Sequence, residues 1–282
     1  MSHHLTEISE EEVPERCLYP AALTIAGSDS GGGAGIQADL RTFSAFGIYG
    51  CSAITALTAQ NPHGVSGIFP AAPDFVALQI RKVLEDFEIK AIKTGMLYSG
   101  EIISAVTDAL EGWTGDLVID PVMVSTSGHS LLREDARLIL MEKLFPRAAW
   151  ITPNIPEAEV ICGMTIKTDP DRYRAIRLCA ERFGCGIVLK GGHLNGPQAE
   201  DLILIGPGKE PFTLSFERLD IPALTTHGTG CTFSAALAAS LAAGSAPEAA
   251  VRNAKQFVYD SLLSAVSPGR TVQAMFPKGF LK

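Results

Sequence analysis

A glycine-rich stretch at residues 225–231, with the sequence TTHGTGC, has residue types that can hold an anion. It precedes an alanine-rich segment at 232–243 that has the composition of a helix. Glycine lets the chain turn tightly, and the backbone N–H groups at a helix start then point outward at the positive end of the helix dipole. The pattern therefore predicts an anion-binding hole that includes Gly228, Thr229 and Gly230.

Cys231 stands in the first turn of this predicted helix. The field that attracts an anion also favours a thiolate, so we expect the pKa of Cys231 to lie below the value of about 8.5 for a free cysteine. Such a thiol can act as a general base or as a nucleophile. The alternative is a small buried residue that packs the start of the helix.

Another glycine-rich loop, AGSDSGGGAGIQAD at residues 26–39, joins a predicted strand to a predicted helix. Its G-x-G-x-x-A pattern formally matches the dinucleotide fingerprint, but that cofactor needs an acid about 20 residues further on. After Asp39 the next acid is Asp74, which disfavours an NAD-dependent dehydrogenase. A Walker-type NTPase is excluded because the sequence has no G-x-x-x-x-G-K-[ST] motif. We expect the bare backbone to let a flat ring approach while Asp39 faces it; a flexible connection is the alternative.

Short apolar runs alternate with helix-length amphipathic segments, which is typical of βαβ units around a parallel sheet. The predicted strands cover residues 22–26, 52–59, 89–93, 117–120, 150–152 and 186–190, with an antiparallel edge pair at 202–205 and 212–216. The predicted helices cover residues 35–46, 73–87, 99–110, 134–144, 156–162, 170–183, 229–243 and 247–265. Because no linker or repeat divides the sequence, we expect one domain over residues 21–282 and a disordered tail over residues 1–20.

Polar or glycine-containing clusters directly follow six of the predicted strands. They are found at residues 27–29, 60–61, 93–96, 120–121, 153–154 and 190–192. Because parallel strands end at the same edge of a sheet, these clusters share the carboxyl edge, where doubly wound proteins bind ligands. Loops are polar in any case, but six such clusters in succession favour an enzyme pocket.

The composition excludes several classes of protein. The formal net charge of −8 disfavours a nucleic-acid clamp, and 46% hydrophobic against 19% charged residues indicates a folded chain. No apolar stretch approaches the roughly 18 residues that span a bilayer, and the first twenty residues do not have the pattern of a signal peptide. We therefore expect a cytoplasmic protein without membrane contact. The six cysteines lack C-x-x-C spacing, which argues against a zinc, iron–sulfur or dithiol redox site and predicts that most are small buried residues.

Eight segments in a fixed order form a more specific pattern. They are AGSD at 26–29, GGAGIQADL at 32–40, ITALTAQN at 54–61, KTGM at 93–96, DPVM at 120–123, TPN at 152–154 with EA at 157–158, KGGH at 190–193 and HGTGC at 227–231. In these segments the chain resembles, over about residues 22–265, the hydroxymethylpyrimidine/phosphomethylpyrimidine kinases of thiamine synthesis, a branch of the ribokinase-like superfamily.

The resemblance implies a ribokinase-like three-layer α/β/α sandwich, with a mostly parallel central sheet and helices on both faces. It implies ATP-dependent phosphorylation of 4-amino-5-hydroxymethyl-2-methylpyrimidine to its monophosphate, and of the monophosphate to the diphosphate. ATP and Mg²⁺ are the implied cofactors, and the implied assembly is a homodimer.

The resemblance also implies roles for the glycine-rich stretch at residues 225–231. Cys231, where much of the superfamily has Asp, would take the hydroxyl proton, and the N–H groups of Gly228 and Gly230 would bind the transferred phosphate, with Thr229 on the ATP side. A loose transition state demands little basicity, so a partly ionised thiol is expected to be enough.

Residues implied to hold ATP and metal come from two other segments. Asn154 and Glu157 match the N-x-x-E element of the superfamily and, with Asp120, would organise Mg²⁺ directly or through water. A helix N-cap completed by Glu157 is the alternative for this pair. Lys190 is expected beside the ATP phosphates or the adenine, and an ordinary turn at a strand end is the alternative. Thr126 stands where the family often has Lys.

For the acceptor, Gln60 matches the position at which the family grips the pyrimidine. Its amide can pair with the ring amino group and with an adjacent ring nitrogen. Met96 and Val122 would pack on the two faces of the ring, and Gly27 and Asp39 would complete the site. A core gap-filler is the alternative for Met96.

Other functions fit parts of this pattern. The nearest alternative is a pyridoxal or pyridoxine kinase, because the same superfamily phosphorylates that hydroxymethyl group. A nucleotide-sensing protein without turnover is disfavoured by Cys231, and a cysteine hydrolase by the lack of a His–Asn/Asp pair matched to that cysteine. His63, His129 and His193 are isolated and are expected on the surface or in loops.

Overall fold

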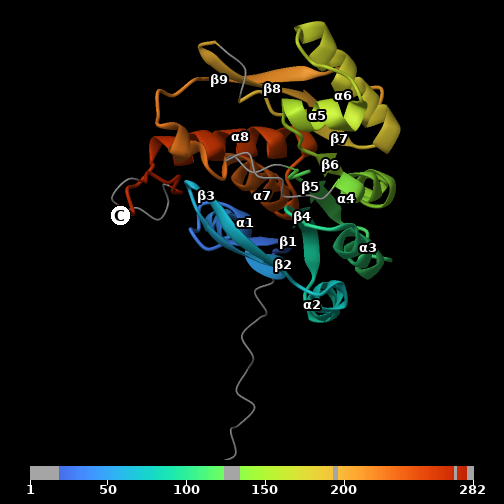
Figure 1. Ribbon diagram of the computed structural model, residues 1–282. Helices are drawn as coiled ribbons and strands as arrows, with labels where there is room; N and C mark the ends of the chain where they lie inside the picture. Colours follow the sequence, from blue (N-terminus) through green and yellow to red (C-terminus); the bar gives the residue numbers. More distant parts are fainter. Residues whose placement is uncertain (1–18, 124–133, 193–195, 270–271, 278–282) are drawn as a thin grey trace, which may run out of the picture.

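The computed structural model describes residues 19–123, 134–192, 196–269 and 272–277. Most of the predicted tail, together with Thr126, His129 and His193, lies outside the described residues. The strands are β1 Ala21–Asp29, β2 Tyr49–Asn61, β3 Gly64–Pro70, β4 Ile89–Thr94, β5 Asp116–Ile119, β6 Trp150–Ile151, β7 Gly186–Leu189, β8 Gln198–Leu204 and β9 Phe212–Glu217. They form one sheet in the order β3-β2-β1-β4-β5-β6-β7-β8-β9 (Figure 1).

Helices cover both faces of this sheet. One face carries α2 Pro73–Asp86, α3 Gly100–Ala109, α4 Glu134–Ile139, α5 Ile155–Cys162 and α6 Asp169–Phe183. The other face carries α1 Gly35–Ala45, α7 Thr229–Ala242 and α8 Pro247–Leu263. Figure 1 shows α7 and α8 side by side. None of the described helices is both long and apolar enough to cross a bilayer.

Strand residues divide between two apolar cores because successive side chains of a strand point to opposite faces. Leu23 of β1 belongs to the core under α2–α6, whereas its neighbour Ala22 belongs to the core under α1, α7 and α8. Ile187 and Val188 of β7 divide in the same way. The predicted three-layer α/β/α sandwich is therefore confirmed.

The sheet is mostly parallel, as predicted. The strands from β2 through β1 and β4 to β7 pair in parallel, and β3, β8 and β9 extend the two edges in antiparallel pairing. The polar clusters at the carboxyl ends of β1, β4, β5, β6 and β7 therefore meet at one edge. The first residues of α7 lie at this same edge, since Gly230 is close to Lys190 and Asp120.

Three details differ from the sequence predictions. Strand β3 was not predicted, because Gly64, Gly67 and Pro70 interrupt its alternation of apolar and polar residues. Strand β8 begins at Gln198 rather than at residue 202. The prediction missed its first half because those residues are mostly polar and only partly buried. The predicted helix 134–144 is α-helical only to Ile139, and the chain continues as a π-helical turn, Leu140–Leu144.

Candidate active site

The two glycine-rich loops of the sequence pack directly on each other. The loop at residues 26–39 is called the first loop and the loop at residues 225–231 the second loop. Gly228, the residue before α7, has a φ of +83°, and a Cβ on it would collide with the backbone oxygen of Gly33 in the first loop. A Cβ on Gly33 would in turn lie 2.7 Å from Cδ2 of His227. Position 228 therefore needs glycine both for its backbone conformation and for this close approach.

A carboxylate organises the first loop and ties it to the second. Oδ2 of Asp29 lies 2.9 Å from Nε2 of His227, and the carboxylate accepts hydrogen bonds from the backbone N–H groups of Gly31, Gly33 and Ala34. Burial acts to raise the pKa of Asp29, but these hydrogen bonds outweigh burial and hold the pKa below its usual value. The first loop is thus folded around an ionised carboxylate.

Gln60, the predicted contact to the pyrimidine, lies at the junction of the two loops. Its Nε2 is 3.3 Å from Nε2 of His227, and Thr58 donates a hydrogen bond to its Oε1. The backbone of Gln60 exchanges two hydrogen bonds of 2.8 Å with the hydroxyl of Ser30. The side chain is half-buried, so the anchored amide can still meet a ligand.

The residues predicted to pack on the ring lie together. Met96 and Val122 belong to one small apolar cluster, to which β3 contributes Val65 and Ile68. A Cβ on Gly27 would lie 2.5 Å from Cε of Met96, so the glycine makes room for that side chain. Sequence reasoning missed Val65 and Ile68, because it did not predict β3.

Asp39 lies in the layer between the sheet and α1. Its carboxylate accepts hydrogen bonds from Nζ of Lys93 at 2.8 and 3.0 Å and from the hydroxyl of Thr24 at 2.6 Å. Neither Asp39 nor Lys93 has exposed surface. Burial would lower the pKa of Lys93, but the attraction of Asp39 outweighs it and raises that pKa, so Lys93 stays charged. A direct contact between Asp39 and a ring stays a prediction.

Cys231 is the third residue of α7, and its thiol accepts a hydrogen bond from the backbone N–H of Gly35 at the start of α1. The predicted lowering of its pKa is wrong. Burial raises the pKa of Cys231 to about 11, Lys93 opposes the rise in part, and Asp39 and Asp120 add to it. Desolvation of the thiolate outweighs the favourable charges because the sulfur is enclosed by protein.

A second charged pair lies at the ends of β5 and β7. Nζ of Lys190 is 2.8 Å from Oδ1 of Asp120, and both side chains are largely buried. A Cβ on Gly230 would lie 3.3 Å from Nζ of Lys190 and 3.6 Å from Oδ2 of Asp120. The start of α7, where the first N–H groups have no partner within the helix, therefore lies beside a lysine and a carboxylate.

Asn154 and Glu157 form a capping box at the start of α5. Oδ1 of Asn154 accepts from the N–H of Glu157 at 2.9 Å, and Oε2 of Glu157 accepts from the N–H of Asn154 at 2.8 Å, so the capping role that stood as the alternative is confirmed. The roles of this pair toward ATP and metal stay predictions. Burial raises the pKa of Glu157 to about 7, Lys190 opposes the rise, and Asp120 adds to it. Glu157 therefore shares a buried charged cluster with Lys190 and Asp120.

This cluster fits a magnesium ion that is held only in part by protein. The described residues contain no group of three or more His, Cys, Asp or Glu side chains that could hold a metal. Mg²⁺ commonly takes one or two carboxylates, and waters and substrate phosphates complete its coordination. Asp120 and Glu157 offer two carboxylates, and when both are ionised their charge exceeds that of Lys190 by one negative charge, which a divalent cation would neutralise.

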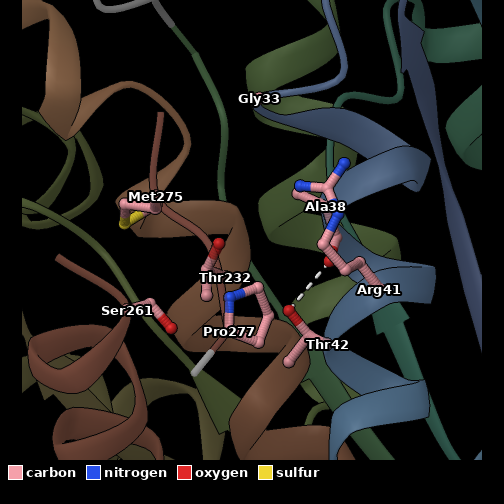
Figure 2. Close-up of a pocket in the computed structure, with 8 residues that line it drawn as sticks. All are labelled: Gly33, Ala38, Arg41, Thr42, Thr232, Ser261, Met275 and Pro277. Atoms are coloured by element: carbon pink, nitrogen blue, oxygen red, sulfur yellow. Dashed lines mark hydrogen bonds between the residues drawn. The ribbon is translucent and has the colours of Figure 1, made fainter. Parts of the chain in front are cut away.

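Two hollows open near these residues. One is a small hollow lined by Thr94, Gly95, Leu97, Ile119, Asp120, Val122 and Leu140. The buried hydroxyl of Thr94 has no hydrogen-bond partner in the described part of the chain. The other lies between α1, α7 and the C-terminal segment (Figure 2) and is lined by Gly33, Ala38, Arg41, Thr42, Thr232, Ser261, Met275 and Pro277. Two predicted site residues, Asp120 and Val122, line the first hollow, and none lines the second.

Sequence reasoning missed a buried acid that holds the loop after β7. Asp201 of β8 accepts a hydrogen bond from the N–H of Gly191 at 2.9 Å and from Nζ of Lys255 at 2.6 Å. It thereby fixes the turn that follows Lys190. An acid at the start of an apolar run has no local pattern that would reveal this partner from α8.

Comparisons with known proteins give the family. A family model described as phosphomethylpyrimidine kinase matches residues 29–275. Over 252 residues, the chain is 45% identical to the hydroxymethylpyrimidine/phosphomethylpyrimidine kinase of Haemophilus influenzae. The aligned region covers 88% of this chain and 93% of that protein. It is also similar to the solved structure of phosphomethylpyrimidine kinase from Clostridium difficile 630, with a TM-score of 0.75 and 40% identity over 86% of this chain and 99% of that chain.

A second solved structure shares the fold. The ADP complex of Bacillus subtilis pyridoxal kinase matches with a TM-score of 0.83 and 35% identity over 91% of this chain and 97% of that chain. These matches agree with the ribokinase-like architecture predicted from the motifs. The chain belongs to the phosphomethylpyrimidine kinase family.

Proposed function

We propose that this chain is the kinase that uses ATP to phosphorylate 4-amino-5-hydroxymethyl-2-methylpyrimidine and then its monophosphate in thiamine synthesis. One observation carries the proposal, which is the position of the start of α7. Gly230 lies beside the Lys190–Asp120 pair, and His227, three residues earlier, contacts Gln60. The N–H groups of this turn thus stand between a charged cluster suited to phosphates and an amide suited to a ring.

The acceptor is held by one polar and several apolar contacts. The amide of Gln60 pairs with the ring amino group and a ring nitrogen, because an amide offers a donor and an acceptor side by side. Met96 and Val122 pack on the ring, and the bare backbone of Gly27 makes room for the Met96 side chain. These contacts fix the hydroxymethyl group with respect to α7.

Cys231 receives the hydroxyl proton. The thiolate form takes this proton, and it is a minor form near pH 7 because burial raises the pKa of the thiol to about 11. The proton leaves the hydroxyl only as bond formation to phosphorus makes that oxygen acidic. The buried ammonium of Lys93 lowers the free energy of the thiolate that carries the reaction forward. The N–H groups of Gly228 and Gly230 bind the oxygens of the migrating phosphate.

On the other side, Thr229, Lys190 and Asn154 contact ATP. Asp120 and Glu157 hold Mg²⁺, which when bound neutralises negative charge on the phosphates. Glu157 must be ionised for this, so its raised pKa makes metal binding sensitive to pH near neutrality.

A pyridoxal kinase is the second candidate, because the chain resembles one at 35% identity over most of its length. Both substrates are flat heteroaromatic rings with a hydroxymethyl group, so the apolar contacts accept either ring. The Gln60 amide favours the aminopyrimidine, because it matches an amino group next to a ring nitrogen, a pattern that pyridoxal lacks.

The deciding experiment measures turnover of hydroxymethylpyrimidine, its monophosphate and pyridoxal in parallel with Mg-ATP. We expect kcat/KM for the first two to exceed that for pyridoxal by at least about tenfold, which corresponds to one well-formed hydrogen bond. A higher kcat/KM for pyridoxal would assign the second function, and turnover of none of the three would overturn both.

We also propose a cytoplasmic homodimer. Leu57 on β2 pairs in register with Phe69 on β3, and they are 52% and 73% exposed. Phe75 on the adjoining α2 is 57% exposed, so large apolar side chains gather on this face. Light scattering on the wild type and on Phe69→Asp tests the assembly, and a monomeric wild type contradicts it. The use of ATP favours the cytoplasm, where ATP is abundant.

A further inference from the structure

Two cysteines far from the reaction site lie in contact. Cys162 is the last residue of α5 and Cys179 lies on α6, and their sulfur atoms are 3.0 Å apart. A disulfide would bring the sulfurs only about 1 Å closer. The sequence offered no C-x-x-C signal for a dithiol, because two packed helices, rather than spacing along the chain, create this pair.

We propose that Cys162 and Cys179 are a reversible oxidation site, at which a peroxide converts the two thiols to a disulfide. The two side chains differ in the way that such a reaction needs. Cys162 is half-buried and accessible to a small oxidant, whereas Cys179 is only 3% exposed and is held against it.

The surroundings make Cys162 the attacking thiol. The contact with Cys179 lowers the pKa of Cys162, burial opposes this, and Arg182 adds to the lowering. The guanidinium of Arg182 is held nearby by a hydrogen bond to the carbonyl oxygen of Ile161. The same contact and burial raise the pKa of Cys179, so Cys179 keeps its proton until the second step.

The chemistry balances in two steps. The Cys162 thiol loses its proton and the thiolate attacks one oxygen of hydrogen peroxide. The O–O bond breaks, Cys162 becomes a sulfenic acid, and the leaving hydroxide takes up a proton and departs as water. The Cys179 sulfur then attacks the sulfenic sulfur, losing its proton while the S–O bond breaks, and a second water leaves. The two thiols lose two electrons, which reduce one peroxide to two waters. A small-molecule dithiol reverses the change.

The site is separate from the catalytic thiol. Cys162 and Cys179 belong to the helical layer of α2–α6, whereas Cys231 belongs to α7 on the opposite face of the sheet. Glu157 lies on the same helix as Cys162, five residues earlier, so the cross-link would fix to α6 the helix that carries a metal-site residue.

The test maps cysteine pairing in the full-length folded protein. The protein is treated with stoichiometric hydrogen peroxide, free thiols are alkylated, and tryptic peptides are analysed without reduction. Cleavage at Arg147, Lys167, Arg177 and Arg182 separates the cysteines, so we expect peptide 148–167 linked to peptide 178–182. The amount of this linked peptide should exceed that of any other disulfide-linked pair by at least about tenfold, and the linked peptide should disappear after treatment with dithiothreitol.

Two variants and a denatured sample sharpen the test. In Cys179→Ser, Cys162 should accumulate as a sulfenic acid that dimedone traps, and Cys185→Ser, which removes the neighbouring buried thiol, should leave the link intact. The proposal is overturned if folded wild-type protein gives no 162–179 link, or if protein in guanidinium chloride forms it as readily as the folded chain, since the packed geometry would then have no part in it.

Discussion

Nζ of Lys93 lies 3.0 and 2.8 Å from the two carboxylate oxygens of Asp39, and neither side chain has exposed surface. This pair lies close to Cys231, and its two charges act on the pKa of that thiol in opposite directions. It ties α1, which follows the first glycine-rich loop, to β4. The pair is therefore both a structural tie between layers and a source of the electrostatic field in the site.

Removing one charge of this pair should be costly. We expect Asp39→Asn to lower the free energy of unfolding by about 3–5 kcal/mol, because the substitution leaves the Lys93 ammonium buried without an opposite charge. Urea denaturation measures the change. Glu248→Gln, which removes a half-exposed partner of Arg252 on α8, is the matched control and should change the free energy by less than about 0.5 kcal/mol. Equal effects of the two substitutions would contradict the importance of burial here.

The thiol of Cys231 should matter for the rate more than for binding. We expect Cys231→Ala to lower kcat by about 10²–10⁴-fold with little change in the acceptor KM, because only proton transfer is lost. Cys51→Ala, which alters a buried thiol in the core under α2–α6, is the control and should keep its activity. Steady-state kinetics of the two variants measure the difference, and unchanged kcat in Cys231→Ala would remove this residue from the reaction.

The pH dependence of kcat gives an independent check of the same role. The pKa of the Cys231 thiol is raised to about 11. Below that pH, the thiolate fraction therefore grows about tenfold for each unit by which the pH is raised. We expect kcat limited by proton transfer to rise between about pH 8 and 10 in wild type and to stay flat in Cys231→Ala. A flat wild-type profile would show that the thiolate does not carry the rate-limiting proton transfer.

Gly228 and Gly244 allow backbone strain to be separated from the contact between the loops. Their φ values are +83° and +82°, but a Cβ on Gly244 would meet no atom within 4 Å, whereas one on Gly228 would collide with Gly33. Substitution by alanine strains both backbones to a similar degree. We expect Gly228→Ala to lower kcat/KM at least about a hundredfold and Gly244→Ala to leave it nearly unchanged, as measured by turnover. Equal activity of the two variants would show that the loop contact does not shape the site.

Glu157 should make stability fall as the pH rises toward neutrality. Its pKa is raised from 4.5 to about 7, so between these values the folded protein binds more protons than the unfolded chain. Stability from this group is therefore present below pH 4.5 and is lost by pH 7, and the loss amounts to a few kcal/mol at most. We expect Glu157→Gln to remove this decline in urea titrations at pH 5 and pH 8 without added magnesium.

The capping box of α6 provides the matched control for Glu157. Asp171 caps Thr168 in the same geometry, but it is exposed and hydrogen bonds lower its pKa. Asp171→Asn should therefore leave the decline between pH 4.5 and 7 in place. If wild-type stability does not fall over this range, the raised pKa of Glu157 is contradicted.

Gln60 should act on the acceptor alone. We expect Gln60→Ala to raise the acceptor KM about tenfold or more, because its hydrogen bonds to the ring are lost, and to change the KM for ATP by less than about twofold. Gln256→Ala, which alters an exposed glutamine of α8, is the control. Steady-state kinetics at varied acceptor and at varied ATP distinguish the two effects, and an unchanged acceptor KM would remove Gln60 from the site.

Local patterns in the sequence were sufficient for most of the fold. The alternation of apolar runs with amphipathic segments predicted the parallel strands and the helices, because each of these elements buries a face with a fixed period. The same patterns failed at β3, where Gly64, Gly67 and Pro70 break the alternation and pairing with β2 decides the strand. That strand supplies Val65 and Ile68 to the apolar cluster around Met96, so an error in one element also left the site incomplete.

The sequence by itself determined which groups stand at the carboxyl edge of the sheet, including the two glycine-rich loops and Cys231 at the start of a helix. Only the tertiary structure decided the chemical state of those groups. Lys93 and Asp39 are 54 residues apart, and His227 and Asp29 are 198 residues apart. Burial and charge partners of this kind depend on how the layers pack rather than on local spacing, which is why the pKa of Cys231 rises where the helix alone predicted a fall.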